Sequence, residues 1–180
     1  MMKSVNKSRL EILVEEAYPR LERFAISICR NKNEAEEVIS ETMLIAIEKY
    51  QSLKDETTFI SFLFTIASRV KVNLFRKNNR FISMEAEYFD FLRSSVQSPE
   101  DLMDIRLLYE ALDKLEYKMR EAIILFDITG LTYKEIALIQ NSTLVAVKLR
   151  IHRGRKKLAK LLDCENDFKQ LTPKYQGVEL

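Results

Sequence analysis

The chain has 180 residues, of which 47% are hydrophobic and 31% charged, a balance typical of a soluble globular protein. With only three Gly and three Pro it lacks the turns that an all-β sandwich or barrel needs, so the composition predicts an all-α protein. The longest stretch without a charged residue, 57–68, has 12 residues and is too short to cross a bilayer.

The residue types that carry catalysis and metal binding are scarce. There is one histidine, His152, and the two cysteines, Cys29 and Cys164, lie 135 residues apart without a spacing motif. We therefore expect no catalytic residue, no metal, no cofactor and no small-molecule substrate. Residues 1–30 carry repeated charges instead of the apolar core of a signal peptide, and cysteines outside a disulfide framework suit a reducing compartment. We expect a cytoplasmic protein.

The net charge is +2, but charged residues are concentrated in two acidic and two basic blocks. Residues 31–60 carry seven acids against three lysines, and residues 84–104 carry six acids against one arginine. Residues 61–80 carry five basic residues and residues 141–160 carry seven, in both cases without an acid. Blocks of this kind are either solvated helix faces or two separate nucleic-acid footprints.

Apolar residues at helical spacing predict a first helix over 10–30, which Pro19 can split or bend. Asn33 is the expected cap of a second helix that runs to about Tyr50 and has acids in its first turn. One face of this second helix is acidic and is formed by Glu37, Ser40, Glu41 and Glu48. Such a face repels phosphates and suits solvent or a basic protein surface.

Residues 51–58 are expected to form a loop, after which Thr57 or Thr58 caps a long helix that ends near Lys77. Aromatic and basic side chains are mixed along this helix, namely Phe59, Phe62, Phe64, Phe75, Arg69, Lys71, Arg76 and Lys77. Melted DNA is bound by such a mixture, with bases stacked on rings and phosphates on cations. A row of Phe at helical spacing is equally typical of a core, so both interpretations stay open.

Helical periodicity is lost over residues 81–98, an acidic segment that predicts a flexible linker. Pro99, followed by acids, is a good start for the next helix. We therefore expect two small helical domains, over 1–80 and 99–165, with a mobile tail over 166–180.

The second predicted domain contains a helix-turn-helix pattern. Thr132 and Glu135 form a capping box that opens a short helix. Asn141 supplies the left-handed residue of the turn, and Thr143 caps the second helix. The second helix is apolar on one face and mainly basic on the other, where it carries Val145, Ala146, Leu149, Arg150, Arg153, Lys156, Lys157 and Lys160. This combination is typical of a helix that reads the major groove of DNA.

Two residues of this second helix allow more than one interpretation. Leu149 is a large apolar side chain on the basic face, where it fits a thymine methyl or a protein partner but is also an ordinary surface leucine. His152 lies on the flank of the helix. We expect it to be half-buried or to face a phosphate, not to act as a ligand or a base.

Three segments, taken in order, resemble the extracytoplasmic-function (ECF) sigma factors, the compact branch of bacterial sigma factors, over about residues 10–162. The segment NEAEEVISETMLIAIEKY (33–50) resembles the region that grips RNA polymerase. The segment TTFISFLFTIASRVKVNLFRKNNR (57–80) is similar to the region that melts the promoter and reads its −10 element. Residues 111–158 look like the −35-reading region, most specifically in LTYKEIA and VKLRIHRGRKKL.

The resemblance implies an RNA polymerase sigma factor that binds core polymerase and directs promoter-specific initiation on melted −10 DNA and double-stranded −35 DNA. An anti-sigma factor is a further partner that the resemblance allows. Carried onto this sequence, the polymerase contact falls on Glu37, Ser40, Glu41 and Ile47. The −10 contact falls on Arg69, Asn73, Arg76 and Lys77. The −35 contact falls on Thr143, Val145, Ala146, Lys148, Leu149, Arg150, Arg153 and Lys156.

Some positions depart from the family pattern, which usually has Trp where Phe62 stands, Asn where Arg69 stands, Asp where Asn73 stands and Gly where Asn141 stands. Because Arg69 and Asn73 lie in the −10-reading helix, the base preference of the family does not carry over. A helix-turn-helix regulator that acts without polymerase remains an alternative, although no segment for a dimer interface or a ligand pocket is present. An enzyme is poorly supported by one His, few Gly and no phosphate-binding loop.

Overall fold

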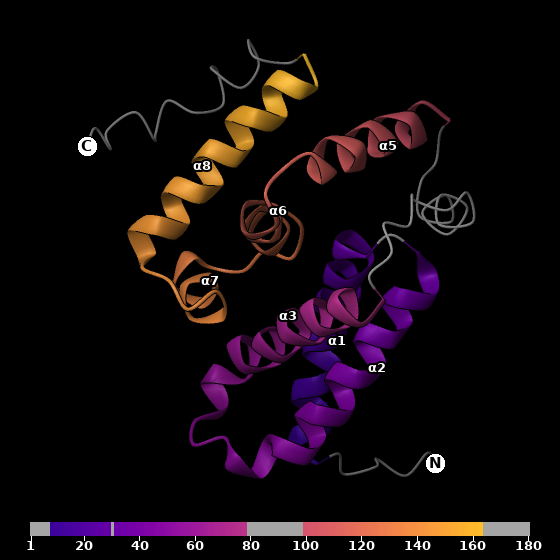
Figure 1. Ribbon diagram of the computed structural model, residues 1–180. Helices are drawn as coiled ribbons and strands as arrows, with labels where there is room; N and C mark the ends of the chain where they lie inside the picture. Colours follow the sequence, from indigo (N-terminus) through magenta and orange to yellow (C-terminus); the bar gives the residue numbers. More distant parts are fainter. Residues whose placement is uncertain (1–7, 30, 79–98, 164–180) are drawn as a thin grey trace, which may run out of the picture.

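The computed structural model describes residues 8–29, 31–78 and 99–163, which are mostly helical and contain no strand (Figure 1). The elements in chain order are α1 (Arg9–Ile28), α2 (Lys32–Lys49), η1 (Tyr50–Ser52), η2 (Glu56–Thr58), α3 (Phe59–Asn78), α5 (Pro99–Asp113), α6 (Tyr117–Ile123), the π-helical turn η3 (Ile124–Ile128), α7 (Tyr133–Ile139) and α8 (Leu144–Leu161). The predicted all-α class is confirmed. The predicted linker, 81–98, and tail, 166–180, lie outside the described residues.

Capping side chains determine where α1 and α2 begin. Ser8 and Glu11 form a capping box at α1. The cap of α2 is Asn31, whose side chain accepts a hydrogen bond from the Glu34 backbone N–H at 2.7 Å, so the prediction of Asn33 was wrong. Both asparagines precede the same acidic turn, and only the backbone conformation distinguishes them: Asn31 is extended, whereas Asn33 is already helical.

The N-terminal part is a bundle of α1, α2 and α3, in which α2 packs against both of the other helices. α1 is not split at Pro19, which lies on its exposed side, where water can reach the carbonyl that loses its donor. In the core, the rings of Phe24 and Phe64 meet edge to face with their centroids 5.5 Å apart. This contact joins α1 to α3.

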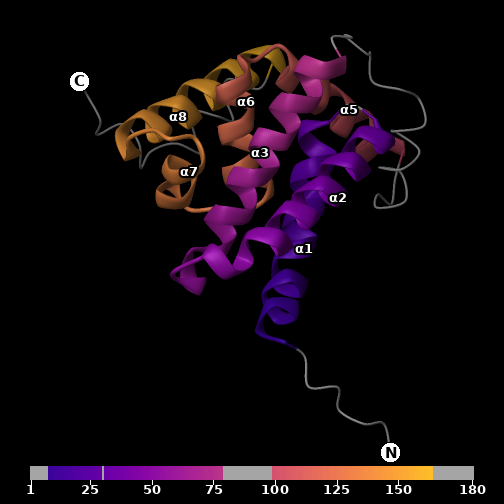
Figure 2. The ribbon, with the colours of Figure 1, turned by 60° about the horizontal axis from the view of Figure 1, so that its bottom comes forward.

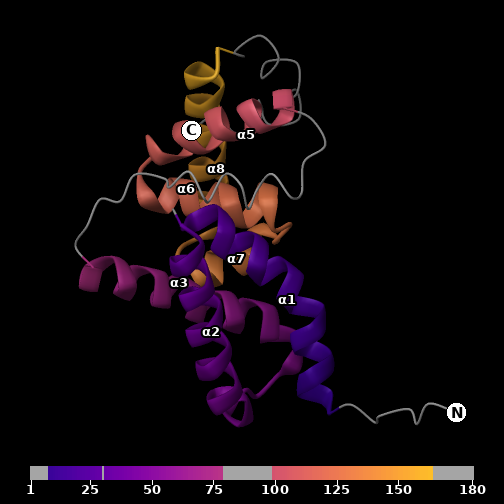
Figure 3. The same cartoon turned by 90° about the vertical axis from the view of Figure 1, so that its right-hand side faces the viewer.

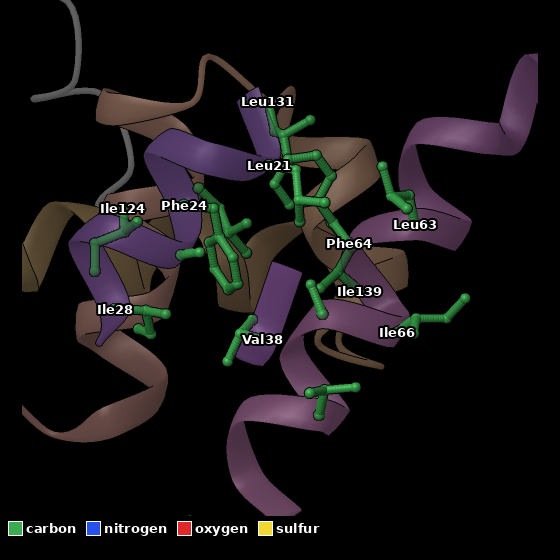
Figure 4. Close-up of a cluster of buried hydrophobic side chains, with 14 of the residues drawn as sticks. Leu21, Phe24, Ile28, Val38, Leu63, Phe64, Ile66, Ile124, Leu131 and Ile139 are labelled. Atoms are coloured by element: carbon green, nitrogen blue, oxygen red, sulfur yellow. The ribbon is translucent and has the colours of Figure 1, made fainter. Parts of the chain in front are cut away.

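One hydrophobic core connects the N-terminal and C-terminal parts. α3 packs against α7, and α1 packs against η3 (Figures 1 and 2). Figure 3 shows the same arrangement from the side, with α6 and α7 next to α1 and α3. Buried side chains of one cluster come from both parts, among them Leu21, Phe24, Phe64, Ile124, Leu131 and Ile139 (Figure 4). The two segments that the sequence predicts as domains are therefore packed together, while their boundaries remain a prediction.

The segment Glu56–Arg76, most of which is α3, is long and apolar enough by length and composition to cross a membrane. Inside the protein, however, 56% of the most apolar 18-residue window of this segment is buried. It also contains Lys71, which forms a buried ion pair with Glu34. We interpret it as the central core helix of the fold.

The C-terminal part has a smaller core of its own where α5, α6 and α8 meet, formed by Ala111, Leu112, Leu115, Met119, Ile123 and Leu158. Gly154 allows α8 to approach α6 closely. A Cβ at this position would lie 2.5 Å from Ile123 Cδ1 and 2.8 Å from Met119 Cγ. Because interiors are close-packed, the missing side chain sets the spacing of the two helices.

This contact predicts the effect of enlarging Gly154. Gly154→Val should destabilise the protein by about 1–3 kcal/mol, because the new methyl groups overlap Ile123 and Met119. Urea unfolding followed by circular dichroism measures the change. The difference between Lys157→Val and Lys157→Gly, at an exposed position of the same helix, measures the helix propensity of valine relative to glycine. If Gly154→Val stabilised the protein by that same difference, packing against α6 would not matter.

Candidate nucleic-acid and polymerase interfaces

The structure contains the predicted helix-turn-helix, formed by α7 and α8. Thr132 Oγ1 accepts from the Glu135 backbone N–H at 3.3 Å, and a Glu135 carboxylate oxygen accepts from the Thr132 backbone N–H at 2.7 Å. Asn141 has a φ of 46°, the left-handed conformation that asparagine tolerates. Thr143 caps α8 by accepting from the Ala146 backbone N–H at 3.1 Å. The turn chemistry predicted from the sequence is confirmed.

The solvent-facing side of α8 is basic. Five of the seven cations in residues 141–160 are exposed, namely Lys148, Arg153, Lys156, Lys157 and Lys160. His152 is exposed on the same side of the helix, so it is not half-buried, and its contact with a phosphate stays a prediction. Because no acid lies within residues 141–160, the helix itself does not offset the positive potential of this side.

The two remaining cations of α8 point inward, and Arg155 is one of them. Its guanidinium pairs with Asp127, with Nε donating to Oδ2 at 3.0 Å, and it lies over the Phe126 ring at 5.1 Å from the centroid. Phe126 stacks on Tyr133 with centroids 4.4 Å apart, and Lys148 Nζ lies 5.7 Å from the Tyr133 centroid. This column of rings and cations fixes η3, α7 and α8 against one another.

Arg150 is the other inward-pointing cation. Its Nη1 donates to Gln140 Oε1, and Gln140 Nε2 donates to Glu121 Oε2 at 2.7 Å. Glu121 is only 4% exposed and also accepts from the hydroxyls of Ser68, in α3, and Tyr117. A chain of hydrogen bonds therefore runs from α3 through α6 and the end of α7 to α8. Part of the Arg150 guanidinium is engaged inside the protein.

The other residues predicted to contact −35 DNA divide by exposure. Thr143, Val145, Lys148, Arg153 and Lys156 are exposed, whereas Ala146 and Leu149 are half-buried. The exposed ones share the solvent-facing side of α8. The structure thus brings most of the predicted set together on one surface and places Arg150 at its inner margin.

Three of the residues predicted to contact −10 DNA lie on one exposed side of α3. They are Arg69, Asn73 and Arg76, at helical positions i, i+4 and i+7. Lys77 belongs to α3, but its side chain is outside the part that the structure describes. The exposed side therefore offers two arginines and an asparagine to a ligand.

The sequence left open whether the aromatic residues of α3 belong to the core or to a DNA-binding surface, and the structure shows residues of both kinds. Phe59 and Phe64 are buried in the core, as a helical row of Phe usually is. Phe75 is 52% exposed, and Phe62 is half-buried. Phe62 lies seven residues before Arg69, two helical turns away on the same side. Only Phe62 and Phe75 are therefore placed where a base could reach them.

The predicted loop before α3 consists of two short 3₁₀ turns, η1 and η2, with a fixed set of hydrogen bonds. Glu56 accepts from Arg9 Nε at 2.8 Å and from the Tyr50 hydroxyl at 2.7 Å. These two bonds hold the pKa of the Glu56 carboxyl below its usual value. Asp55 caps η2 by accepting from the Thr57 backbone N–H at 2.9 Å. The segment next to the exposed side of α3 is thus conformationally defined.

The exposed side of α2 carries all four residues predicted to contact the polymerase: Glu37, Ser40, Glu41 and Ile47. Leu44, which the sequence interpretation missed, lies among them and is 59% exposed. Its spacing gave the signal, since Leu44 follows Glu37 by seven residues and Glu41 by three, on one helix side. The surface is therefore acidic with an apolar centre.

Among the described residues, no group of three or more His, Cys, Asp or Glu side chains could hold a metal ion. Cys29 is a buried free thiol, and burial raises its pKa to about 12. A thiol that stays protonated is a poor nucleophile and a poor metal ligand.

Two family models match the chain, one in each of its two parts. Residues 13–81 match the family model of Sigma-70 region 2, and residues 105–158 match that of Sigma-70, region 4. The chain is 34% identical over 158 residues to the ECF RNA polymerase sigma factor EcfG of Rhodopseudomonas palustris, covering 84% of this chain and 85% of that protein. It is 27% identical over 154 residues to the RNA polymerase sigma factor SigV of Bacillus subtilis, covering 86% and 91%.

Two solved structures are similar over both parts of the chain. One is the sigma factor RpoE in complex with the anti-sigma factor NepR from Bartonella quintana, with a TM-score of 0.72, 26% identity and coverage of 86% of this chain and 96% of that one. The other is CnrH in complex with the cytosolic domain of CnrY, with a TM-score of 0.66, 26% identity and coverage of 86% and 88%.

The chain belongs to the ECF branch of the sigma-70 family of RNA polymerase sigma factors. It directs promoter-specific initiation of transcription, with core RNA polymerase and promoter DNA as its partners. A helix-turn-helix regulator acting without polymerase is not favoured. The family model of Sigma-70 region 2 matches residues 13–81, and EcfG is similar over 84% of this chain, so the similarity is not confined to the helix-turn-helix.

Lys71 shows why the charge blocks of the sequence overstate the DNA-binding surface. It lies in the basic block 61–80, yet its side chain is only 5% exposed and pairs with Glu34 of α2. Its ammonium is therefore a structural group that ties α3 to α2, not a phosphate contact.

Removing this cation should destabilise the fold. Lys71→Met should lower the free energy of unfolding by about 2–4 kcal/mol, because it leaves the Glu34 carboxylate in a largely buried site without its cation. The double variant Lys71→Met, Glu34→Leu should recover most of the loss. As a control, Arg106→Met breaks an exposed pair with Glu110 and should cost less than about 1 kcal/mol. Urea denaturation of the variants measures these differences, and a Lys71 effect no larger than the Arg106 effect would contradict the structural role.

Proposed function

We propose that α8 reads the −35 element, that α3 with the 51–58 segment holds the melted −10 strand, and that the exposed side of α2 contacts core RNA polymerase. One observation carries this division of roles. Two exposed cationic surfaces lie on different helices, α3 and α8, whereas the exposed side of α2 is acidic around an apolar centre. Phosphates are attracted to the first two surfaces and repelled by the third.

Position along α8 assigns the −35 contacts. Thr143, Val145, Ala146 and Leu149 lie near the N-terminal end of the helix, which approaches base edges in a helix-turn-helix. Arg153 and Lys156 lie further along, where the helix passes the phosphates. Lys148 lies on the exposed side of the helix, and Arg150 lies at its inner margin. Arg150 retains guanidinium N–H groups beyond the one bonded to Gln140, so it can still meet a guanine or a phosphate.

On α3, Arg69 and Asn73 take the positions that choose a base, and Arg76 and Lys77 take those that hold phosphates. Phe62 supports this role, because a half-buried ring on the same side is a platform on which an extruded base can stack. Base extrusion costs a few kcal/mol, which such contacts must offset.

On α2, Leu44 and Ile47 supply the apolar contact area, and Glu37, Ser40 and Glu41 form the polar rim around it. Interfaces between proteins commonly have an apolar centre that excludes water and a rim of polar side chains. The acidic rim also favours a basic partner surface and speeds the encounter.

The chain would act in the cytoplasm and without a catalytic residue or cofactor of its own, because the polymerase performs the chemistry. Both solved relatives were captured with a protein partner, the anti-sigma factor NepR in one case and the cytosolic domain of CnrY in the other. We include an anti-sigma factor among the partners proposed for this chain.

The −35 assignment predicts a salt-dependent defect. Lys156→Ala should weaken binding to all −35 sequences alike and reduce the slope of log K against log salt concentration by about one unit, because one phosphate contact is lost. Fluorescence anisotropy with a set of labelled duplexes at several salt concentrations measures both quantities. Lys118→Ala, which removes an exposed lysine of α6, should change neither. A sequence-dependent loss in the Lys156 variant would assign this lysine to base reading instead.

The polymerase assignment predicts a defect that leaves DNA contacts intact. The charge reversal Glu37→Lys, Glu41→Lys should weaken binding of core polymerase at least ten-fold, because it places two cations in the rim that faces a basic partner. Leu44→Ser should also weaken binding, through the loss of apolar contact area. The matched reversal Glu16→Lys, Asp104→Lys, at exposed positions of α1 and α5, should bind as the native chain does. Native-like core binding by both α2 variants would remove this surface from the interface.

A further inference from the structure

The side chain of Gln140 is buried where α8 packs against α6 and α7 (Figure 1). Gln140 is the C-cap residue of α7 and directly precedes Asn141, the left-handed residue of the turn. Its side-chain hydrogen bonds go to Lys118 and Glu121 of α6 and to Arg150 of α8. Because the amide is covered by protein, Gln140 is not itself placed to contact DNA, but it touches a residue that is.

The orientation of the Gln140 amide is determined by its donors. Nε2 donates to the Lys118 carbonyl at 3.0 Å and to Glu121 Oε2 at 2.7 Å, and these two bonds use both hydrogens of the amide. A flipped amide would turn its oxygen toward two acceptors and lose both bonds. Oε1 therefore has one orientation, in which it accepts from Arg150 Nη1.

Glu121 is held in turn by donors on its other side. Its carboxylate also accepts from the Tyr117 hydroxyl at 3.2 Å and from the Ser68 hydroxyl. All of these donors are uncharged, so the first positive charge along this chain of hydrogen bonds is the Arg150 guanidinium. Burying a charge is costly without compensation, and the Gln140 amide connects the buried carboxylate to a cation.

A guanidinium held in one orientation is suited to reading a base. Guanine O6 and N7 accept two N–H groups of an arginine only when the guanidinium lies close to the plane of the base. A phosphate makes no such demand and carries no sequence information. Arg150 uses one N–H group on Gln140 and keeps the others for a ligand. Because it is ordered before DNA arrives, it loses less freedom on binding.

We propose that Gln140 is a positioning residue for −35 recognition, which holds the Arg150 guanidinium in the orientation that reads one guanine at the margin of the α8 surface. Glu121 acts behind it by fixing the amide. The inference rests on the proposed role of α8 and deepens it, because it assigns the choice at one base pair to a buried residue that does not touch the DNA.

Nuclear magnetic resonance of the free chain with labelled arginine tests the positioning without DNA. The Arg150 signals are assigned by their loss in Arg150→Ala. Rotation of the Arg150 guanidinium should be about ten-fold faster in Gln140→Met than in the native chain, because a hydrogen bond from a charged group is lost. Equal rotation in the two proteins would overturn the inference.

Base preference tests the consequence. Holoenzymes reconstituted with core polymerase are bound to a promoter library randomised in the −35 element, and the bound sequences are counted. Arg150→Ala should lower the preference for guanine at one base pair at least about five-fold and leave the others unchanged. Gln140→Met should lower the preference at the same base pair at least about three-fold. In the Arg150→Ala background, Gln140→Met should change nothing further at that base pair, because it acts through Arg150.

An exchange of the two side chains provides a variant that restores the contact. In Glu121→Gln, Gln140→Glu the new carboxylate at position 140 accepts from Arg150, and the new amide at position 121 donates to that carboxylate. This double variant should retain the native base preference. Ile139→Val is the matched control for a loss of packing in α7, because Ile139 is buried next to Gln140 without belonging to its hydrogen bonds. It should lower stability and leave every base preference as it is.

The outcomes separate the inference from the function on which it rests. A loss of affinity for all sequences alike in Gln140→Met or Arg150→Ala would overturn the inference, while a native preference within the −35 element would still support α8 as the reading helix. If circular dichroism shows that Gln140→Met does not fold, the exchange variant decides, and a folded exchange variant with altered preference at that base pair overturns the inference. A native holoenzyme without any base preference in the −35 element would contradict both the role of α8 and the inference.

Discussion

The structure depends on the apolar packing of α1 and α3 against η3 and α7. This contact places Leu21, Phe24 and Phe64 in the same buried cluster as Ile124, Leu131 and Ile139 (Figure 4). A part of about 70 residues buries a smaller fraction of its surface than a chain of twice that size, so joining the two parts adds stability that neither has alone. The hydrogen bonds from Arg20 to the carbonyls of Thr129 and Gly130, and from Arg120 to the carbonyl of Ile28, cross the same boundary beside this packing.

The fold leaves fewer basic side chains available to DNA than the two positive blocks of the sequence suggest. Of the basic residues in the two positive blocks, Lys71, Arg150 and Arg155 make contacts inside the protein, with Glu34, Gln140 and Asp127. Burying a charge is costly unless it is paired, and each of these groups has a partner on another element. The cations left on the surface then form two coherent patches. The inward-facing ones hold the helices that carry these patches in fixed orientation.

The sequence by itself determined the local features: the all-α class, the capping box at Thr132, the left-handed Asn141, the cap at Thr143, and the family, because each depends on residues that are neighbours in the chain or on one helix. It also indicated most of the exposed residues on α2, α3 and α8 through helical periodicity. It could not show that Asn31 caps α2 instead of Asn33, or that Lys71 and Arg150 point inward. Nor could it show that Arg20 reaches residues more than 100 positions away. These outcomes were decided by tertiary structure, because burial and pairing depend on which helices meet, and α1, α3, η3 and α7 meet only when the whole chain has folded.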